Sequence, residues 1–259
     1  MNIKNMRISF KSSDAMRKII LISAFFFIMP ESVFAGAGIL FDGVTGYFMV
    51  KTSSLFPTSE EYSITGWIKT SQVRTSAIYC ESASAPGSIS VYSQISATGS
   101  LAIDAFPPSA LFVVAKSSIT TNKWINFTTS YRPSGVVAIY INGIIDINGS
   151  IGVYNDSAIV DFVYWGRRNN NVNHNQDGYF DGSMANMRVY NRFLSADEAM
   201  EIYTCSDSIV SGLAGSWTMM DSTAQKDLSI NNNTAQSFSG TTSQSDGPPI
   251  NLCYGGIPN

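Results

Sequence analysis

The sequence predicts an all-β fold, a two-sheet antiparallel jelly-roll sandwich with one short helix near residues 195–203. Two observations support this prediction. Short runs rich in β-branched and aromatic residues recur with period-2 alternation, and Gly, Pro, Ser and Asn divide them. Many short strands separated by turn residues are typical of sandwiches and jelly rolls.

The strand pattern recurs along most of the chain. We expect strands at Gly38–Phe41, Tyr47–Lys51, Tyr62–Thr70, Ser76–Cys80, Ser88–Ser93, Leu101–Ala105, Leu111–Ala115, Trp124–Tyr131, Val136–Ile141, Val160–Trp165 and Ser183–Tyr190. Between Ile141 and Ile144 the Asn-Gly pair favours a two-residue hairpin turn, because both residues tolerate positive φ.

The predicted helix carries its own start signal. Ser195 is the expected N-cap, and Glu198 three residues later completes a capping box. Asp197 adds a negative charge at the helix N-terminus, where the helix dipole favours it. The apolar surface that docks the helix comes from Ala199, Met200 and Ile202.

Residues 1–35 have the pattern of a signal peptide. Basic residues precede the apolar run Ile19–Met29, which is too short to span a bilayer comfortably. Val33 and Ala35 stand at the −3 and −1 positions of a cleavage site. The mature protein, residues 36–259, is therefore expected to be secreted, periplasmic or on the cell surface. A membrane anchor is the alternative interpretation of this segment.

The mature chain suits one large sandwich domain. Residues 1–35 hold five of the 16 basic and two of the 19 acidic residues, so the mature chain carries a formal net charge of −6. This charge argues against nucleic acid or an anionic membrane as a partner. No later stretch is apolar enough to cross a membrane, so the processed protein is not expected to span one.

Three cysteines remain after processing. Cys80 lies in a strand-like run, where a buried, inert thiol is expected. Cys205 and Cys253 lie in loop-like sequence and bracket the C-terminal segment. Because exported proteins form disulfides, we predict a Cys205–Cys253 bond.

Four segments of the chain carry distinctive motifs: Phe41–Val50 (FDGVTGYFMV), Tyr62–Thr70 (YSITGWIKT), Lys123–Gly143 with its KWINF and AIYING motifs, and Gly178–Tyr203 (GYFDGSMANMRVYNRFLSADEAMEIY). In order and spacing they resemble the bacterial laminin-G-like domains of the concanavalin A-like lectin/glucanase superfamily. The resemblance covers about Gly38–Tyr203 and implies a jelly-roll fold. By the same resemblance Asp42 is a candidate calcium ligand, although Ala185 stands where the family usually has an acid.

The order of segments departs from the family. Residues 212–221 (GLAGSWTMMD) and 227–233 (DLSINNN) resemble the family's opening strand, yet they follow the closing helix. We therefore expect a circular permutation in which residues 209–259 supply a relocated strand of the same sandwich. In that strand Leu213, Gly215, Trp217 and Met219 would share one face. A truncated second repeat is the alternative.

Catalytic patterns are missing from the sequence. Glycoside hydrolysis needs a pair of carboxylates, and no Glu-x-Asp-x-Glu strand occurs. His174 is the only histidine, and there is no Gly-x-Ser-x-Gly elbow for a serine nucleophile. We therefore expect no enzymatic activity.

The densest polar stretch, Asn169–Asp181, is the best candidate for a binding loop. Asn amides both donate and accept hydrogen bonds, which suits sugar hydroxyls. The candidate ligand-binding residues are Tyr154, Asp156, Asn170, Asn173 and Asp177. Asp177 and Asp181 could instead hold calcium, the one candidate cofactor. A hydrophilic rim loop without a ligand is the alternative.

The four tryptophans are assigned by position. Trp67, Trp124 and Trp217 lie in patterned strands and are expected in the core. Trp165 is the best aromatic candidate for stacking on a sugar, but a core position is favoured for it as well.

These features favour an exported, non-catalytic recognition module that binds a glycan or a surface protein. The alternative is a structural or assembly protein of the cell surface without a small ligand.

The cysteine pattern gives a direct test. Mass spectrometry of a non-reduced digest should show a Cys205–Cys253 peptide, because closing a loop of this length contributes roughly 4 kcal/mol in the chain-entropy model. A bridge to Cys80, or no bridge, would contradict the pairing.

Overall fold

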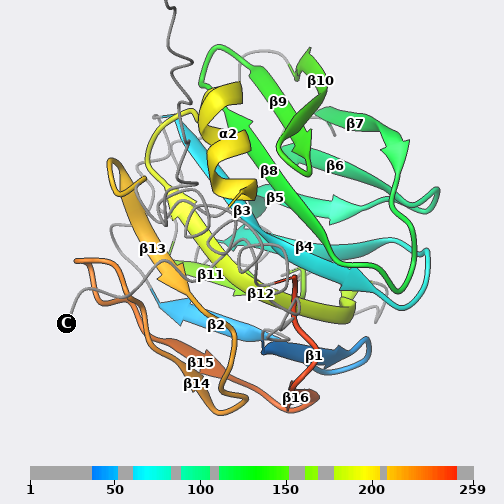
Figure 1. Ribbon diagram of the computed structural model, residues 1–259, viewed down its shortest axis with the longest axis vertical. Helices are drawn as coiled ribbons and strands as arrows, with labels where there is room; N and C mark the ends of the chain where they lie inside the picture. The colour runs from blue at the N-terminus through cyan, green and yellow to red at the C-terminus, as the bar shows by residue number, and fades with distance from the viewer. Residues whose placement is uncertain are drawn as a thin grey trace, which may run out of the picture. The chain divides into compact units, whose positions relative to one another are not determined.

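Two antiparallel sheets of eight strands each form the fold in the computed structural model (Figure 1), which describes residues 37–51, 61–82, 89–105, 111–151, 161–168, 178–204 and 209–249. Within these residues there is one helix, α2 (Ala196–Tyr203), and it does not have the length and apolarity needed to span a membrane. The predicted all-β sandwich with a short helix is confirmed.

The first sheet is built mainly from the middle of the chain. Its strands run in the order β10 (Ile144–Ser150), β9 (Val136–Ile141), β8 (Ile125–Tyr131), β3 (Tyr62–Thr70), β12 (Asp181–Tyr190), β1 (Gly38–Asp42) and β16 (Thr241–Gln244), and β13 (Leu213–Trp217) also pairs with β12.

The second sheet packs against the first. Its order is β14 (Ala224–Gln225), β15 (Ala235–Ser237), β2 (Phe48–Lys51), β11 (Phe162–Trp165), β4 (Ser76–Ser82), β5 (Ile89–Ile95), β6 (Ser100–Ala105) and β7 (Leu111–Ser118).

The β9–β10 hairpin turns where the sequence predicts it. Asn142 and Gly143 both have positive φ, at 51° and 74°. Gly143 has a second constraint, because an added Cβ would lie 2.8 Å from Cα of Met200 and 2.9 Å from Cβ of Tyr203. The turn therefore requires glycine both for its conformation and for its contact with α2.

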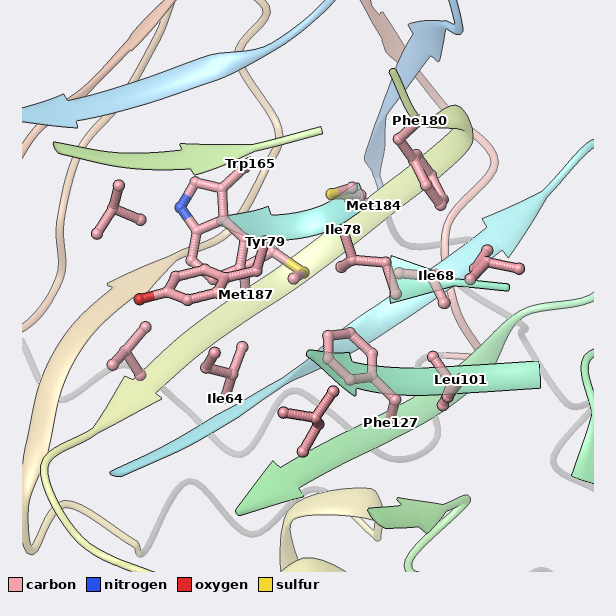
Figure 2. Close-up of a cluster of buried hydrophobic side chains, with 14 of the residues drawn as sticks. Ile64, Ile68, Ile78, Tyr79, Leu101, Phe127, Trp165, Phe180, Met184 and Met187 are labelled. Atoms are coloured by element: carbon pink, nitrogen blue, oxygen red, sulfur yellow. The ribbon is translucent and has the colours of Figure 1, made fainter. Parts of the chain in front are cut away.

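Large side chains from both sheets meet in the core (Figure 2). Trp165 of β11 and Trp217 of β13 are both fully buried, and their rings meet edge-on at 5.6 Å. Tyr79 packs on Trp165 with ring centroids 4.9 Å apart. Trp165 therefore takes the core position that the sequence favours, and the alternative that it stacks on a sugar is wrong, because Trp165 faces the other sheet.

The remaining two tryptophans differ from each other. Trp67 is buried as predicted, with its ring 5.8 Å from that of Tyr203. Trp124 is only half-buried, because it precedes β8 and has no inward strand position. Its Nε1 donates a hydrogen bond to Asp246, and the ammonium of Lys69 lies 5.5 Å from its ring.

Helix α2 begins as predicted and covers the outer face of the first sheet. The amide of Glu198 donates to Oγ of Ser195, and the amide of Ser195 donates to the Glu198 carboxylate, which completes the capping box. Ala199 packs on Ala138 and Tyr140 of β9, consistent with the position of α2 in Figure 1. The helix buries Ala199 and Ile202, whereas Met200 remains 38% exposed.

Residues 209–249 contribute strands to both sheets, β13 and β16 to the first and β14 and β15 to the second. The pairing of β12 with β13 shifts register between Gly215 and Leu213. The resulting bulge places Ala214 with Trp217 in the main core, while Leu213 joins a separate cluster around Tyr190. The expectation that Leu213 and Trp217 share one face is wrong for this reason.

The loop after β13 is held by a buried carboxylate. Asp227 is 1% exposed and accepts hydrogen bonds from the amides of Ser216, Ser229 and Asn233, each at 2.8 Å. The indole Nε1 of Trp217 donates to the carbonyl of Asn233 at 2.9 Å. The DLSINNN motif therefore fixes the strand that carries Trp217.

Removing the C-terminal segment should destroy the fold. A mature chain ending at Thr204 loses strands from both sheets and should aggregate, because neighbouring edges become exposed. In the full chain, Trp217→Ala should lower the free energy of unfolding by about 3–5 kcal/mol, and the control Ile230→Ala, at a 97% exposed position, should change it little. A soluble truncated chain with the melting temperature of the intact protein would show that the segment is an appendage.

Candidate ligand-binding site

Most of the residues that the sequence nominates for binding lie outside the described residues. They are Tyr154, Asp156, Asn170, Asn173 and Asp177. The predicted disulfide partners Cys205 and Cys253 also lie outside the described residues. Their roles stay predictions.

Asp42 caps the turn between β1 and β2. Its Oδ1 accepts hydrogen bonds from the amides of Val44, Thr45 and Gly46 at 2.8–2.9 Å, and its Oδ2 accepts one from the Thr45 hydroxyl at 2.8 Å. Partial burial alone would raise the pKa of Asp42, but these hydrogen bonds outweigh it and lower the pKa to about 2. The carboxylate thus has a structural role in the turn.

Asp181 is also engaged locally, since it accepts hydrogen bonds from the side chains of Ser71 and Gln72. Ala185, where the family usually has an acid, is fully buried. Among the described residues, no three His, Cys, Asp or Glu side chains group in a way that could hold a metal. Calcium binding at Asp42 stays a prediction.

The register of the second sheet aligns one residue from each of six strands. These residues, which we name the outer row, are Met49, Tyr164, Cys80, Tyr92, Asp104 and Phe112, each directly opposite the next. Their immediate neighbours in sequence, such as Val163 and Trp165, belong to the core. The outer row therefore faces away from the first sheet.

Two arginines extend over the outer row from the end of β11. The guanidinium of Arg167 lies 4.4 Å from the ring centroid of Tyr47 and 4.8 Å from that of Tyr164. Arg168 lies 5.5 Å from the Tyr92 ring, and its Nη1 donates to the Tyr92 hydroxyl at 3.3 Å. Cation–π contacts hold both groups in position without neutralising their charge.

The chain reaches this position through Gly166, which has a φ of 87°. An added Cβ there would lie 2.6 Å from the ring of Phe41, so a larger residue would disturb the core. The carbonyl of Gly166 accepts a hydrogen bond from the amide of Phe180 at 2.8 Å, which links the end of β11 to the residue before β12.

The C-terminal segment also reaches the outer row. Phe238, just after β15, stacks on Tyr47 with ring centroids 4.4 Å apart and an interplanar angle of 7°. Tyr47 in turn lies 6.0 Å from Tyr164. The aromatic surface therefore continues from β11 across β2 to the segment after β15.

Asp104 is the acidic member of the outer row. It is 5% exposed, and this burial raises its pKa, against the opposing effects of a hydrogen bond from Tyr92 and the charge of Arg168. The side-chain amide of Gln94 also donates to this carboxylate. Burial and the Asp104 charge raise the pKa of Tyr92 to about 12, although Arg168 acts in the opposite direction. Arg168, Tyr92 and Asp104 thus form one hydrogen-bonded chain.

The neighbouring carboxylate, Glu81, points the other way. Its Oε1 accepts a hydrogen bond from the Tyr79 hydroxyl at 2.7 Å, and the residue is 3% exposed. Burial and the Glu81 charge raise the pKa of Tyr79 well above its usual value. Cys80 is fully buried, as the sequence predicts. The outer row therefore contains a single acid.

Sequence patterns alone did not reveal this site, because it depends on the register of six strands. The usable signal was that Tyr47, Met49, Phe162 and Tyr164 are large side chains at positions that alternate with core positions. A strand that is apolar on both faces buries one face in the core, and the apolar side chains on its other face indicate an interaction surface.

The architecture is that of a lectin-type β-sandwich. A family model described as the concanavalin A-like lectin/glucanases superfamily matches residues 42–200, and the chain belongs to this superfamily. No curated protein sequence matches the chain.

Solved structures share the fold at low sequence identity. A heptameric SAP-like pentraxin from Limulus polyphemus is 13% identical, with a TM-score of 0.62 over 85% of this chain and 98% of its own. A candidate carbohydrate-binding protein from Bacteroides ovatus is 16% identical, with a TM-score of 0.60 over 81% of this chain and 60% of its own. The CBM40 of a Ruminococcus gnavus IT-sialidase is 16% identical, with a TM-score of 0.51 over 64% of this chain and 96% of its own.

The Asp42 turn predicts a defined pH dependence. Asp42→Ala should lower the free energy of unfolding at neutral pH by about 1–2 kcal/mol, because amides of the turn lose their acceptor. Since the folded pKa, about 2, lies below the usual value of 3.8, this contribution is present above pH 4 and lost as the pH falls toward 2. Denaturant unfolding of both proteins between pH 7 and pH 2 should show the difference shrinking. A difference that grows on acidification would contradict this role.

Proposed function

We propose that this protein is an exported, non-catalytic recognition module that binds a glycan at the outer face of the second sheet. The observation that carries the proposal is the outer row with Arg167 and Arg168 above it. The descriptions of the Bacteroides ovatus protein and of the CBM40 support a carbohydrate ligand, and the predicted signal peptide supports export.

The chemistry of the surface suits sugars. A sugar ring has an apolar face of C–H groups, which gains free energy when it is buried against aromatic or thioether surface. Tyr47, Met49 and Phe162 are half-buried, and Phe112 is 61% exposed, so they offer such surface. Gln94 and the arginines offer hydrogen bonds to hydroxyl groups.

The outer face of the second sheet keeps exposed or half-buried side chains at Met49, Arg167 and Phe112. On the first sheet, outward residues of the central strands are fully buried, including Ser63, Thr65 and Thr128. The carbonyl of Arg192 and the amide of Leu194, which lead into α2, bond to Ser63 itself. A ligand would have to displace this segment to reach the first sheet.

The acids of the outer row support recognition without hydrolysis. Glycosidases place two carboxyl groups across the scissile bond, and the outer row supplies Asp104 alone. Asp104 is occupied by Tyr92 and Gln94 and has little exposed surface. These contacts leave little of the carboxylate surface for a substrate.

A carbohydrate array with mature protein tests the proposal. Phe112→Ala and Gln94→Ala should each weaken the Kd of the best glycan by about 10-fold, because each removes a contact worth roughly 1–1.5 kcal/mol. The melting temperature should change little for Phe112→Ala and fall slightly for Gln94→Ala, because Gln94 donates to the buried Asp104 carboxylate. The exposed control Ile230→Ala should bind normally.

Two further variants separate this site from the polar loop. If Asn173→Ala and Asp177→Ala weaken binding while the Phe112 and Gln94 variants do not, the site is in residues 169–177. If no glycan binds, the proposal is wrong and a structural or assembly role at the cell surface is favoured.

A further inference from the structure

We propose that the outer face of the second sheet selects acidic glycans, whose carboxylate or sulfate groups bind to Arg167 and Arg168. This inference rests on the proposed glycan-binding function and names the class of sugar.

Burial decides which groups a ligand can reach. Tyr164, Tyr92 and Asp104 are 7%, 3% and 5% exposed, so the middle of the outer row is a floor and not a contact surface. Arg167 and Arg168 are half-buried and lie over these rings. A ligand above the centre of the row therefore meets guanidinium groups before it meets aromatic rings.

Both guanidinium groups are fixed in position before a ligand arrives. Arg167 contacts two tyrosine rings, and Arg168 is held by the ring and the hydroxyl of Tyr92. Less side-chain entropy is therefore lost when an anion binds. Guanidinium groups bind carboxylate and sulfate oxygens through charge-assisted, often paired hydrogen bonds.

The local charge is opposite to that of the protein. The mature chain has a formal net charge of −6, but in the described part of this face two arginines accompany one carboxylate, Asp104. Lys51, exposed at the end of β2 and on the same side as Met49, adds a third positive charge. Such a local positive field in an acidic protein favours an anionic ligand.

Asp104 acts as an internal competitor for this ligand. Tyr92, whose hydroxyl accepts a hydrogen bond from Arg168, lies directly opposite Asp104, and the Arg168 charge lowers the pKa of Asp104, so the carboxylate and the guanidinium attract each other. Removing that charge should leave Arg168 more available to a ligand anion. Asp104→Asn should therefore strengthen the binding of acidic glycans, which is the opposite of what loss of a supporting residue would do.

Calorimetry with matched polymers tests the inference. The mature protein is titrated with dextran and dextran sulfate, and with fully methyl-esterified and de-esterified polygalacturonate. The acidic member of at least one pair should bind about 10-fold or more tightly than its neutral partner. The pair that shows the preference distinguishes sulfate from carboxylate as the recognised group.

Variants then assign the preference to its residues. Arg167→Ala and Arg168→Ala should each abolish most of the preference, and Arg168→Lys should retain part of it because the charge remains. Arg132→Ala is the matched control, because Arg132 also stacks on a ring, that of Phe193, but belongs to the other sheet. Melting temperatures identify any variant that fails to fold. If the arginine variants fail to fold, Asp104→Asn still tests the inference, because it should raise the affinity for acidic glycans.

Each outcome has a separate meaning. Equal affinity for neutral and acidic members, lost on Phe112→Ala, would overturn the charge selection but uphold glycan binding. An acidic preference that Arg132→Ala reduces as much as Arg168→Ala would show general attraction of polyanions and overturn the inference. No binding to any glycan would contradict the proposed function itself.

Discussion

The contact between Trp165 and Trp217 is the interaction on which the rest of the structure depends. Each indole is fully buried, and the two come from different sheets and from segments that are distant in sequence. Trp217 attaches residues 209–249 to the sandwich, and Trp165 anchors β11 against the first sheet. Burial of two large aromatic side chains in one contact stabilises both sheets together.

The candidate site lies on the opposite face of β11, the strand that carries Trp165. In β11, Trp165 points inward, so Tyr164 must point outward, and the turn at Gly166 then carries Arg167 and Arg168 over the outer row. The C-terminal segment contributes on both sides, with Trp217 in the core and Phe238 against Tyr47. Recognition chemistry and folding stability are therefore linked through one short strand, and changes to its inward residues should disturb both.

Local patterns predicted much of the fold. The bounds of β3 and β9, the Asn-Gly turn and the Ser195 capping box agree with the structure because each depends on residues close in sequence. The short strands β14, β15 and β16 were not predicted, because they are short, mostly polar segments without alternation. Bulges such as the one at Ala214 cannot be predicted from local patterns either, since they depend on the partner strand.

The site was harder to predict than the fold for a related reason. From the sequence, binding residues were predicted in polar segments such as residues 169–181. The binding residues predicted there lie outside the described residues. The outer row exists only after six strands are placed in register, so residues from Met49 to Phe112 become neighbours through pairing alone. Trp124 was expected in the core but is half-buried, because it precedes β8 and alternation cannot show where a strand begins.

The most direct measurement is a crystal structure of the mature protein with an acidic oligosaccharide bound. The account predicts that the sugar lies across β11, β4 and β5 on the outer face of the second sheet, with its acidic group at Arg167 or Arg168. A sugar bound on the α2-covered face, or one that contacts neither arginine, would contradict it.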